Sequence, residues 1–210
     1  MVKAWIADVT PLCREECYER YYHMVPEFRR EKADRLKHPG MKAQSVGVWF
    51  LWQKIRERYG LPEDCSFNLS HSGTLVMCAA EVEGSRAQVG CDIEKTGKLR
   101  LNIAEHYFCP EEYAAIVREP SGEAQTEMFY RYWVLKESFM KATRKGMALP
   151  ADRFCIRMGE QGEPPVLIRQ PEEFPEEYHY CEYTVPGLAY RMAVCTTDGR
   201  IDRELHVEQL

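Results

Sequence analysis

The chain has 210 residues, of which 45% are hydrophobic and 29% charged, and its formal net charge is −5. This composition fits one sizeable globular domain or two small halves that share a core. The negative charge argues against nucleic acid as a partner, so a polyanionic ligand needs a local basic cluster.

The chain carries no signal-peptide hydrophobic region and no apolar run of membrane-spanning length, so we expect no membrane association. Its nine cysteines are scattered and form no CxxC pair, which argues against a zinc site and fits a reducing cytoplasm. We also expect the protein to be a monomer.

Residues 1–98 are predicted to form an N-terminal half. The expected elements are a strand over 2–9, helical structure over 13–36 with a break near Pro26, a helix over 41–59 closed by Gly60, a short extended segment over 67–69, and strands over 74–82 and 87–94. A turn is predicted at 39–40, and the polar stretch over 70–73 is predicted to be a loop.

Residues 99–210 are predicted to form a C-terminal half. The expected elements are a short helix before Cys109, helices over 110–118 and 124–145, and strands over 154–158, 166–169, 178–184 and 189–196. The fold class is therefore α+β. We expect two pseudo-symmetric halves, each a small antiparallel sheet packed with helices, with a ligand cleft between them.

The long helix over 124–145 has two predicted faces. A core-facing stripe is expected at 128, 132, 135, 139 and 142. Trp133, Glu137 and Lys141 follow at i, i+4 and i+8 on the opposite side. An exposed Glu–Lys pair beside a stray aromatic is the alternative interpretation of this second face.

Asp92 and Glu94 lie two residues apart on a predicted strand, so both carboxylates share one face. Such a pair repels unless a cation lies between its members, and oxygen ligands at this spacing suit Mg²⁺. The alternative is a solvated strand end. His71, with Ser70 beside it, sits in a Gly-bearing polar stretch typical of a phosphate site, although a lone histidine is more often structural.

Three motifs resemble the 4′-phosphopantetheinyl transferases, specifically the long type that activates surfactin synthetase. They are Asn-Leu-Ser-His-Ser-Gly at 68–73, Gly-Cys-Asp-Ile-Glu at 90–94 and Trp-Val-Leu-Lys-Glu-Ser-Phe-Met-Lys at 133–141. The resemblance covers nearly the whole chain. It implies transfer of the phosphopantetheine arm of coenzyme A to a serine of an acyl, peptidyl or polyketide carrier protein, with release of adenosine 3′,5′-bisphosphate.

The resemblance also implies roles for single residues. Asp92, Glu94 and Glu137 match the family's Mg²⁺ carboxylates, and Lys141 matches its pyrophosphate-binding lysine. His71, with Ser70, matches its coenzyme A phosphate site. Basic residues near the adenosine 3′-phosphate are matched by Arg29 and Lys32. The catalytic group would be Glu137, Lys141 and Asp92, with Glu137 as base.

Two departures weaken the expected grip on the adenosine end. A Gly-Lys-Pro loop that often precedes the histidine motif is missing or shortened, and Gln44 stands where relatives often have an arginine. The acidic and basic centre is intact.

Two other functions remain open from the sequence. One is a metal-dependent hydrolase of pyrophosphate-containing nucleotides, and the other is a module that binds carrier or coenzyme A without turnover. For an acidic carrier, we expect the docking surface to follow the long helix: Arg144, Lys145, Met147 and Leu149.

Overall fold

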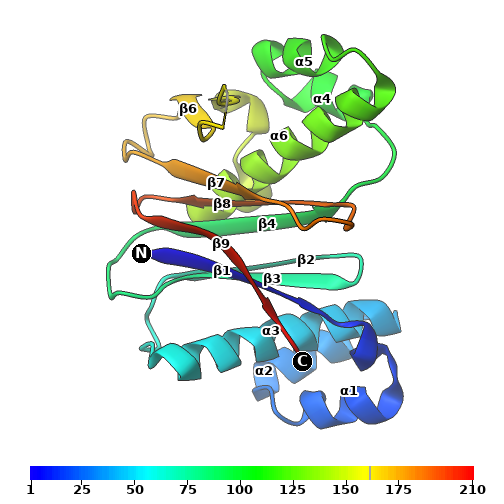
Figure 1. Ribbon diagram of the computed structural model, residues 1–210. Helices are drawn as coiled ribbons and strands as arrows, with labels where there is room; N and C mark the ends of the chain where they lie inside the picture. The colour runs from blue at the N-terminus through cyan, green and yellow to red at the C-terminus, as the bar shows by residue number, and fades with distance from the viewer. Residues whose placement is uncertain (161) are drawn as a thin grey trace.

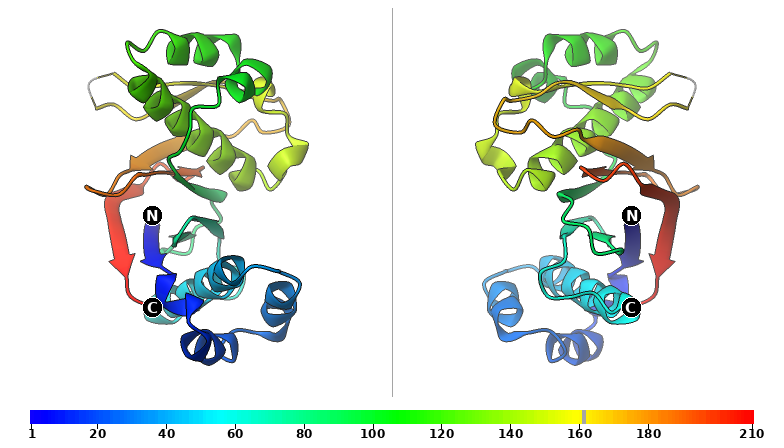
Figure 2. Two further views of the ribbon diagram at one scale, coloured as in Figure 1. Left: turned by 90° about the vertical axis from the view of Figure 1, so that its right-hand side faces the viewer. Right: turned by 90° about the vertical axis from the view of Figure 1, so that its left-hand side faces the viewer.

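The computed structural model describes residues 1–160 and 162–210. Two β-sheets lie face to face in the middle of the molecule, and helices cover the outer face of each sheet (Figure 1). After a rotation of 90° about the vertical axis, the molecule shows an upper lobe and a lower lobe, with the sheets between the two groups of helices (Figure 2). The predicted α+β class is confirmed.

The lower lobe holds the first sheet and three α-helices. Its elements are β1 (Val2–Asp8), η1 (Thr10–Cys13), α1 (Glu15–Tyr22), α2 (Glu27–Asp34), α3 (Pro39–Tyr59), β2 (Phe67–Ser72), β3 (Leu75–Glu81) and β9 (Ile201–Glu208).

The upper lobe holds the second sheet and the other three α-helices. Its elements are β4 (Val89–Lys95), α4 (Leu101–Tyr107), α5 (Pro110–Val117), α6 (Gly122–Ala142), η2 (Gly146–Ala148), η3 (Ala151–Arg153), β5 (Cys155–Arg157), β6 (Val166–Arg169), β7 (His179–Tyr183) and β8 (Tyr190–Thr196).

Sheet membership crosses the boundary predicted at residue 98. The first sheet has the order β2-β3-β1-β9 and the second β4-β8-β7-β6-β5. Strand β4 therefore belongs with the C-terminal strands, and β9, which the sequence did not predict, returns to pair in parallel with β1. Each half contributes a strand to the sheet of the other, so neither sheet is complete without both.

Three apolar cores hold the layers together. One lies between the first sheet and α1–α3, one between the second sheet and α4–α6, and one between the two sheets. The last includes Cys91 and Ile93, whose side chains take the inner face of β4. Because side chains alternate along a strand, Asp92 and Glu94 are directed away from this core.

Helix α6 is buried on almost every side, in contrast to the two-faced helix that the sequence predicted. The expected stripe residues Leu135 and Phe139 are fully buried, but so are Val134 and Ser138 from other faces of the helix. Trp133 is partly buried against the same core. The second sheet covers one flank of α6 and α5 packs against another, so few of its residues are exposed.

Gly90 sets the contact between α6 and β4. A Cβ atom at this position would lie 2.0 Å from the backbone oxygen of Ser138 and 2.3 Å from the backbone nitrogen of Ala142. Only glycine permits so close an approach. The glycine of the Gly-Cys-Asp-Ile-Glu motif thus lets the helix that carries Glu137 and Lys141 lie directly on the strand that carries Asp92.

Two local predictions were wrong. Ser70, His71 and Ser72 form no loop but continue β2, paired in register with β3. Pro39 and Gly40 form no separate turn, because Pro39 occupies the first turn of α3, where its missing N–H costs nothing. Among the helices in the described part of the chain, none is long and apolar enough to cross a membrane.

Candidate active site

The edge strands of the two sheets, β2 and β4, are joined by side chains and not by a backbone ladder. The N–H of Cys91 donates to Asn68 Oδ1 at 3.2 Å, that of Ile93 to Ser70 Oγ at 3.4 Å, and that of Lys95 to Ser72 Oγ at 3.1 Å. The alternate residues Asn68, Ser70 and Ser72 therefore satisfy the backbone donors at the edge of β4, of which that of Ile93 is buried.

The same serines hold the two carboxylates of β4. Ser70 Oγ donates to Asp92 Oδ1 at 2.8 Å, and Ser72 Oγ donates to Glu94 Oε2 at 2.7 Å. Lys141 reaches the same point from α6, with Nζ 2.6 Å from Asp92 Oδ1 and 2.9 Å from Ser70 Oγ. The structure thus brings together Ser70, Asp92 and Lys141 from β2, β4 and α6.

Four charged side chains interact where α6 meets β4. Burial, and then the neighbouring Asp92 carboxylate, raises the pKa of Glu137. Burial is also the main cause that raises the pKa of Glu94, although the Ser72 hydroxyl opposes it. Burial disfavours the charge of Lys141, but the Asp92 carboxylate beside it raises the pKa of this lysine. The site therefore favours a cation among its acids.

The donor set suits a hard divalent ion. Asp92 Oδ2 is buried and has no hydrogen-bond partner among the described residues, so one carboxylate oxygen is left for a ligand. Among the described residues, the acid group Asp92, Glu94 and Glu137 does not bring three ligand atoms within 4.8 Å of one another. Binding all three to one ion would require side-chain rotation.

The basic residues predicted to bind the nucleotide influence one another electrostatically, from α2 to α6. Desolvation, followed by the cations of Lys141 and Lys32, lowers the pKa of His71. Burial, and then the cation of Arg29, lowers the pKa of Lys32. The guanidinium carbon of Arg29 lies 4.5 Å from the ring centre of Trp49. Arg29 Nε is buried without a partner among the described residues, which leaves a donor for an anion.

Gln44 of α3 lies beside the turn that follows His71. Its Nε2 donates to the backbone oxygen of Gly73 at 2.8 Å. The side chain is therefore near the histidine motif. Whether it faces the nucleotide stays a prediction.

Three residues that hold the site together were missed from the sequence. Asn68 and Ser72 carry a detectable signal, because with Ser70 they repeat every second residue. The third is Lys136, only 2% exposed, whose Nζ pairs with Glu112 at 2.8 Å and also donates to the backbone oxygen of Phe154. Its position next to Glu137 is the only local signal, since its partner Glu112 is remote in sequence.

The predicted docking surface is only partly available. Met147 is 81% exposed, and Lys145 is exposed beside it. Leu149, in contrast, is 3% exposed and belongs to the upper core, so it cannot offer an apolar contact to a partner. Arg144 has a structural contact, because its Nη2 donates to the backbone oxygen of Phe67 at 2.7 Å.

Cavity size does not single out this site. Two cavities of about 600 and 470 Å³ are lined by other side chains, and neither includes Asp92, Glu137 or Lys141. The acidic and basic cluster is the candidate active site because of its chemistry.

Comparison with known proteins agrees with the three motifs. Residues 88–195 match the model of the 4′-phosphopantetheinyl transferase superfamily. The chain is 34% identical over 200 residues to 4′-phosphopantetheinyl transferase Sfp of Bacillus subtilis strain 168, covering 91% of this chain and 83% of the relative. It is 39% identical over 85 residues to 4′-phosphopantetheinyl transferase HetI of a Nostoc strain, covering 39% of this chain and 34% of the relative.

Among solved structures, holo-[acyl-carrier-protein] synthase of Thermotoga maritima aligns with 54% of this chain and 64% of its own, at 19% identity and a TM-score of 0.44. The family match and the extent of the sequence identity decide the assignment. The chain therefore belongs to the 4′-phosphopantetheinyl transferase superfamily and is a phosphopantetheinyl transferase of the Sfp type.

Proposed function

We propose that this enzyme transfers the 4′-phosphopantetheine arm of coenzyme A to a serine of an apo carrier protein, in the cytoplasm. The reaction would require Mg²⁺ and release adenosine 3′,5′-bisphosphate. The carrier could be an acyl, peptidyl or polyketide carrier protein, since nothing in the site selects among them.

The carboxylate of Asp92 is the observation that carries this proposal. One of its oxygens accepts from Lys141 and Ser70, and the other is buried without a partner among the described residues. A cationic side chain and a free carboxylate oxygen at one point suit a pyrophosphate held together with a metal ion.

The metal would be held by Asp92, Glu94 and Glu137. When bound, Mg²⁺ would supply Lewis acidity to the pyrophosphate oxygens. Lys141 would stabilise the negative charge that develops on the bridging oxygen as the bond to the β-phosphorus breaks. His71, Lys32 and Arg29 would bind the phosphates of coenzyme A, and thereby orient the β-phosphorus toward the carrier serine.

Glu137 would take the proton of that serine, directly or through a water molecule. Burial raises the pKa of this carboxyl, and a raised pKa makes a carboxylate a better base near neutral pH. Glu137 is also a candidate ligand, and the two roles predict different behaviour. If the residue is the base, Glu137→Gln retains much of its metal affinity but loses turnover. If it is a ligand, the metal affinity and the turnover decrease together.

The direct test is to incubate the protein with coenzyme A and a panel of apo carriers, with Mg²⁺ or with a chelator, and to weigh the products. A mass gain of one phosphopantetheine on a carrier serine, only with Mg²⁺, supports the proposal. Release of free phosphopantetheine without modified carrier would instead indicate the hydrolase. Coenzyme A or carrier binding without any product would indicate the non-catalytic module.

A further inference from the structure

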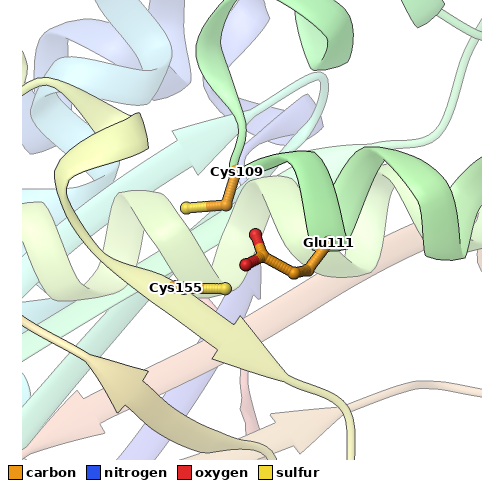
Figure 3. Close-up of side chains that lie close together, drawn as sticks. All are labelled: Cys109, Glu111 and Cys155. Carbon is orange, nitrogen blue, oxygen red and sulfur yellow. The ribbon is translucent and has the colours of Figure 1, made fainter.

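A second cluster of ligand atoms lies away from the acidic site. It consists of Cys109 at the N-cap of α5, Glu111 in the first turn of that helix, and Cys155 at the start of β5. Their two sulfurs and a carboxylate oxygen all lie within 4.8 Å of one another (Figure 3). The Glu111 carboxylate is directed toward the two sulfurs, although the two cysteines are far apart in sequence.

The two thiols are buried beneath a solvent-exposed ion pair. Cys109 is 0% and Cys155 1% exposed, whereas the side chains of Glu111 and Arg169 are 61% and 50% exposed. Glu111 and Arg169 approach each other to 3.8 Å, and Arg169 Nη2 donates to Cys109 Sγ at 3.0 Å. Both are long side chains on the surface, so their movement would open a path from solvent to the sulfurs.

We propose that Cys109, Cys155 and Glu111 form a binding site for a thiophilic divalent metal ion such as Zn²⁺. Two thiolates and a carboxylate are donors that such an ion accepts, and a water molecule can complete a tetrahedral set. Two sulfurs on one tetrahedral zinc stand about 3.8 Å apart, given Zn–S bonds of about 2.3 Å. The observed spacing is close enough for small side-chain rotations to reach it.

The charges balance when the ion binds. Two thiol protons leave, so the two thiolates, the carboxylate and the divalent ion together carry one negative charge. The guanidinium of Arg169, already within hydrogen-bond distance of Cys109, offsets it. The absence of a CxxC pair does not argue against this site, because the tertiary structure and not the local spacing brings the ligands together.

This site is joined to the helix that carries Glu137. Cys109 N donates to Glu112 Oε2 at 2.9 Å, and Ile156 N donates to Glu112 Oε1 at 2.8 Å. Glu112 is the buried partner of Lys136. An ion on Cys109 and Cys155 would therefore clamp α5 to β5 around the residue that anchors α6. We expect it to stabilise the upper lobe without contact with Asp92.

The test uses the full chain, freshly reduced with a phosphine and stripped with a chelator that is then removed. Cd²⁺ is titrated in the presence of excess Mg²⁺, which occupies carboxylate sites. We expect one Cd²⁺ per chain by native mass spectrometry, with a thiolate-to-cadmium charge-transfer band, and a higher melting temperature. Competition with Zn²⁺ then gives the zinc affinity.

Variants locate the ion. Cys109→Ala and Cys155→Ala should each abolish the band, whereas the matched control Cys65→Ala should retain it. Glu111→Gln changes an exposed side chain and should fold normally, and we expect it to weaken Cd²⁺ binding by about tenfold. The proposal is overturned by a titration without a band, by binding that survives loss of either cysteine, or by unchanged affinity in Glu111→Gln.

Discussion

The ammonium of Lys141 lies 2.6 Å from Asp92 Oδ1, where α6 meets β4. The Asp92 side chain is 4% exposed and that of Lys141 26%. Removing either partner therefore leaves the other charge unpaired and poorly solvated. The sequence suggested that Asp92 is destabilising without a metal, because it lies near another acid. This ion pair reverses that expectation.

Asp92→Ala should therefore abolish transfer and also lower the free energy of unfolding without Mg²⁺ by about 1–3 kcal/mol. The measurement is chemical denaturation with a chelator present. In a double-mutant cycle, adding Lys141→Met should recover part of the loss, because the unpaired cation is gone. Equal or greater stability of Asp92→Ala alone would show that repulsion among the acids outweighs the ion pair.

Gly90→Ala should separate α6 from β4, because its Cβ would overlap the helix backbone at Ser138 and Ala142. We expect a loss of about 1–3 kcal/mol in unfolding free energy and a large loss of turnover. Gly122→Ala is the matched control, because Gly122 belongs to α6 itself and an added Cβ there meets nothing within 4 Å. If the two variants have the same stability and turnover, Gly90 is not required for the close approach of α6 to β4.

Gln44→Arg should tighten coenzyme A binding by about tenfold, since a charge-assisted contact to the 3′-phosphate is worth about 1.4 kcal/mol or more. Turnover should change little, because that phosphate is remote from the bond that breaks. Isothermal titration measures the affinity. Gln44→Met controls for loss of the hydrogen bond to Gly73.

The ligand 3′-dephospho-coenzyme A distinguishes the source of the gain. It should bind Gln44→Arg no better than it binds the parent enzyme. Equal improvement for both ligands would mean that Gln44 does not face the 3′-phosphate, and the assignments of Arg29 and Lys32 would then need revision.

Lys145→Glu should raise the KM for an acidic carrier more than the KM for coenzyme A, and added salt should shrink the difference. Lys145 is preferred to Arg144 for this test, because Arg144 also bonds to Phe67 and adopts a positive φ of 59°. Arg118→Glu, an exposed reversal at the end of α5, is the matched control. Steady-state kinetics with both substrates give the values, and equal effects on the two would place Lys145 at the nucleotide.

Acid should weaken the attachment of β9. The hydrogen bond from Arg58, with further help from Lys54, lowers the pKa of Glu208 from its ordinary 4.5 to about 2. A carboxyl whose pKa is lowered by folding stabilises the fold above its ordinary pKa, and this contribution is lost as pH falls from 4.5 to about 2.

Glu208→Gln should therefore lower the unfolding free energy near neutral pH by up to about 1 kcal/mol, and the difference should vanish in strong acid. Denaturation over a pH series measures it. Glu204→Gln, at an exposed position of the same strand, is the control and should leave the unfolding free energy nearly unchanged. If Glu208→Gln is still less stable than the parent protein in strong acid, the loss of unfolding free energy is due to packing and not to the ion pairs.

The sequence by itself identified the family of this protein. The motifs at 68–73, 90–94 and 133–141 carry the residue types that a phosphoryl-transfer site needs, and they led to the family that comparison confirmed. Most helices and strands were also predictable, because apolar periodicity and the closing Gly60 are local signals. Helix α6 was found, but its burial on several faces was not, since periodicity reports only the strongest side.

Only the tertiary structure decided how these parts are joined. Strand β9 is charged and half exposed at a sheet edge, so its pattern was too weak to predict, and its parallel pairing with β1 depends on residues at opposite ends of the chain. The same holds for the transfer of β4 to the second sheet. Strand pairing depends on residues far apart in the sequence, because it is determined by which apolar faces can be buried together.

The contacts that position the site are non-local as well. Serines at 70 and 72 bond to β4 because two sheet edges meet there, and Lys136 is neutralised by Glu112 from another helix. The proximity of Cys109 to Cys155 has the same origin. A sequence lists the donors and acceptors, but each needs a partner within about 3 Å, and folding alone decides which partner comes that close.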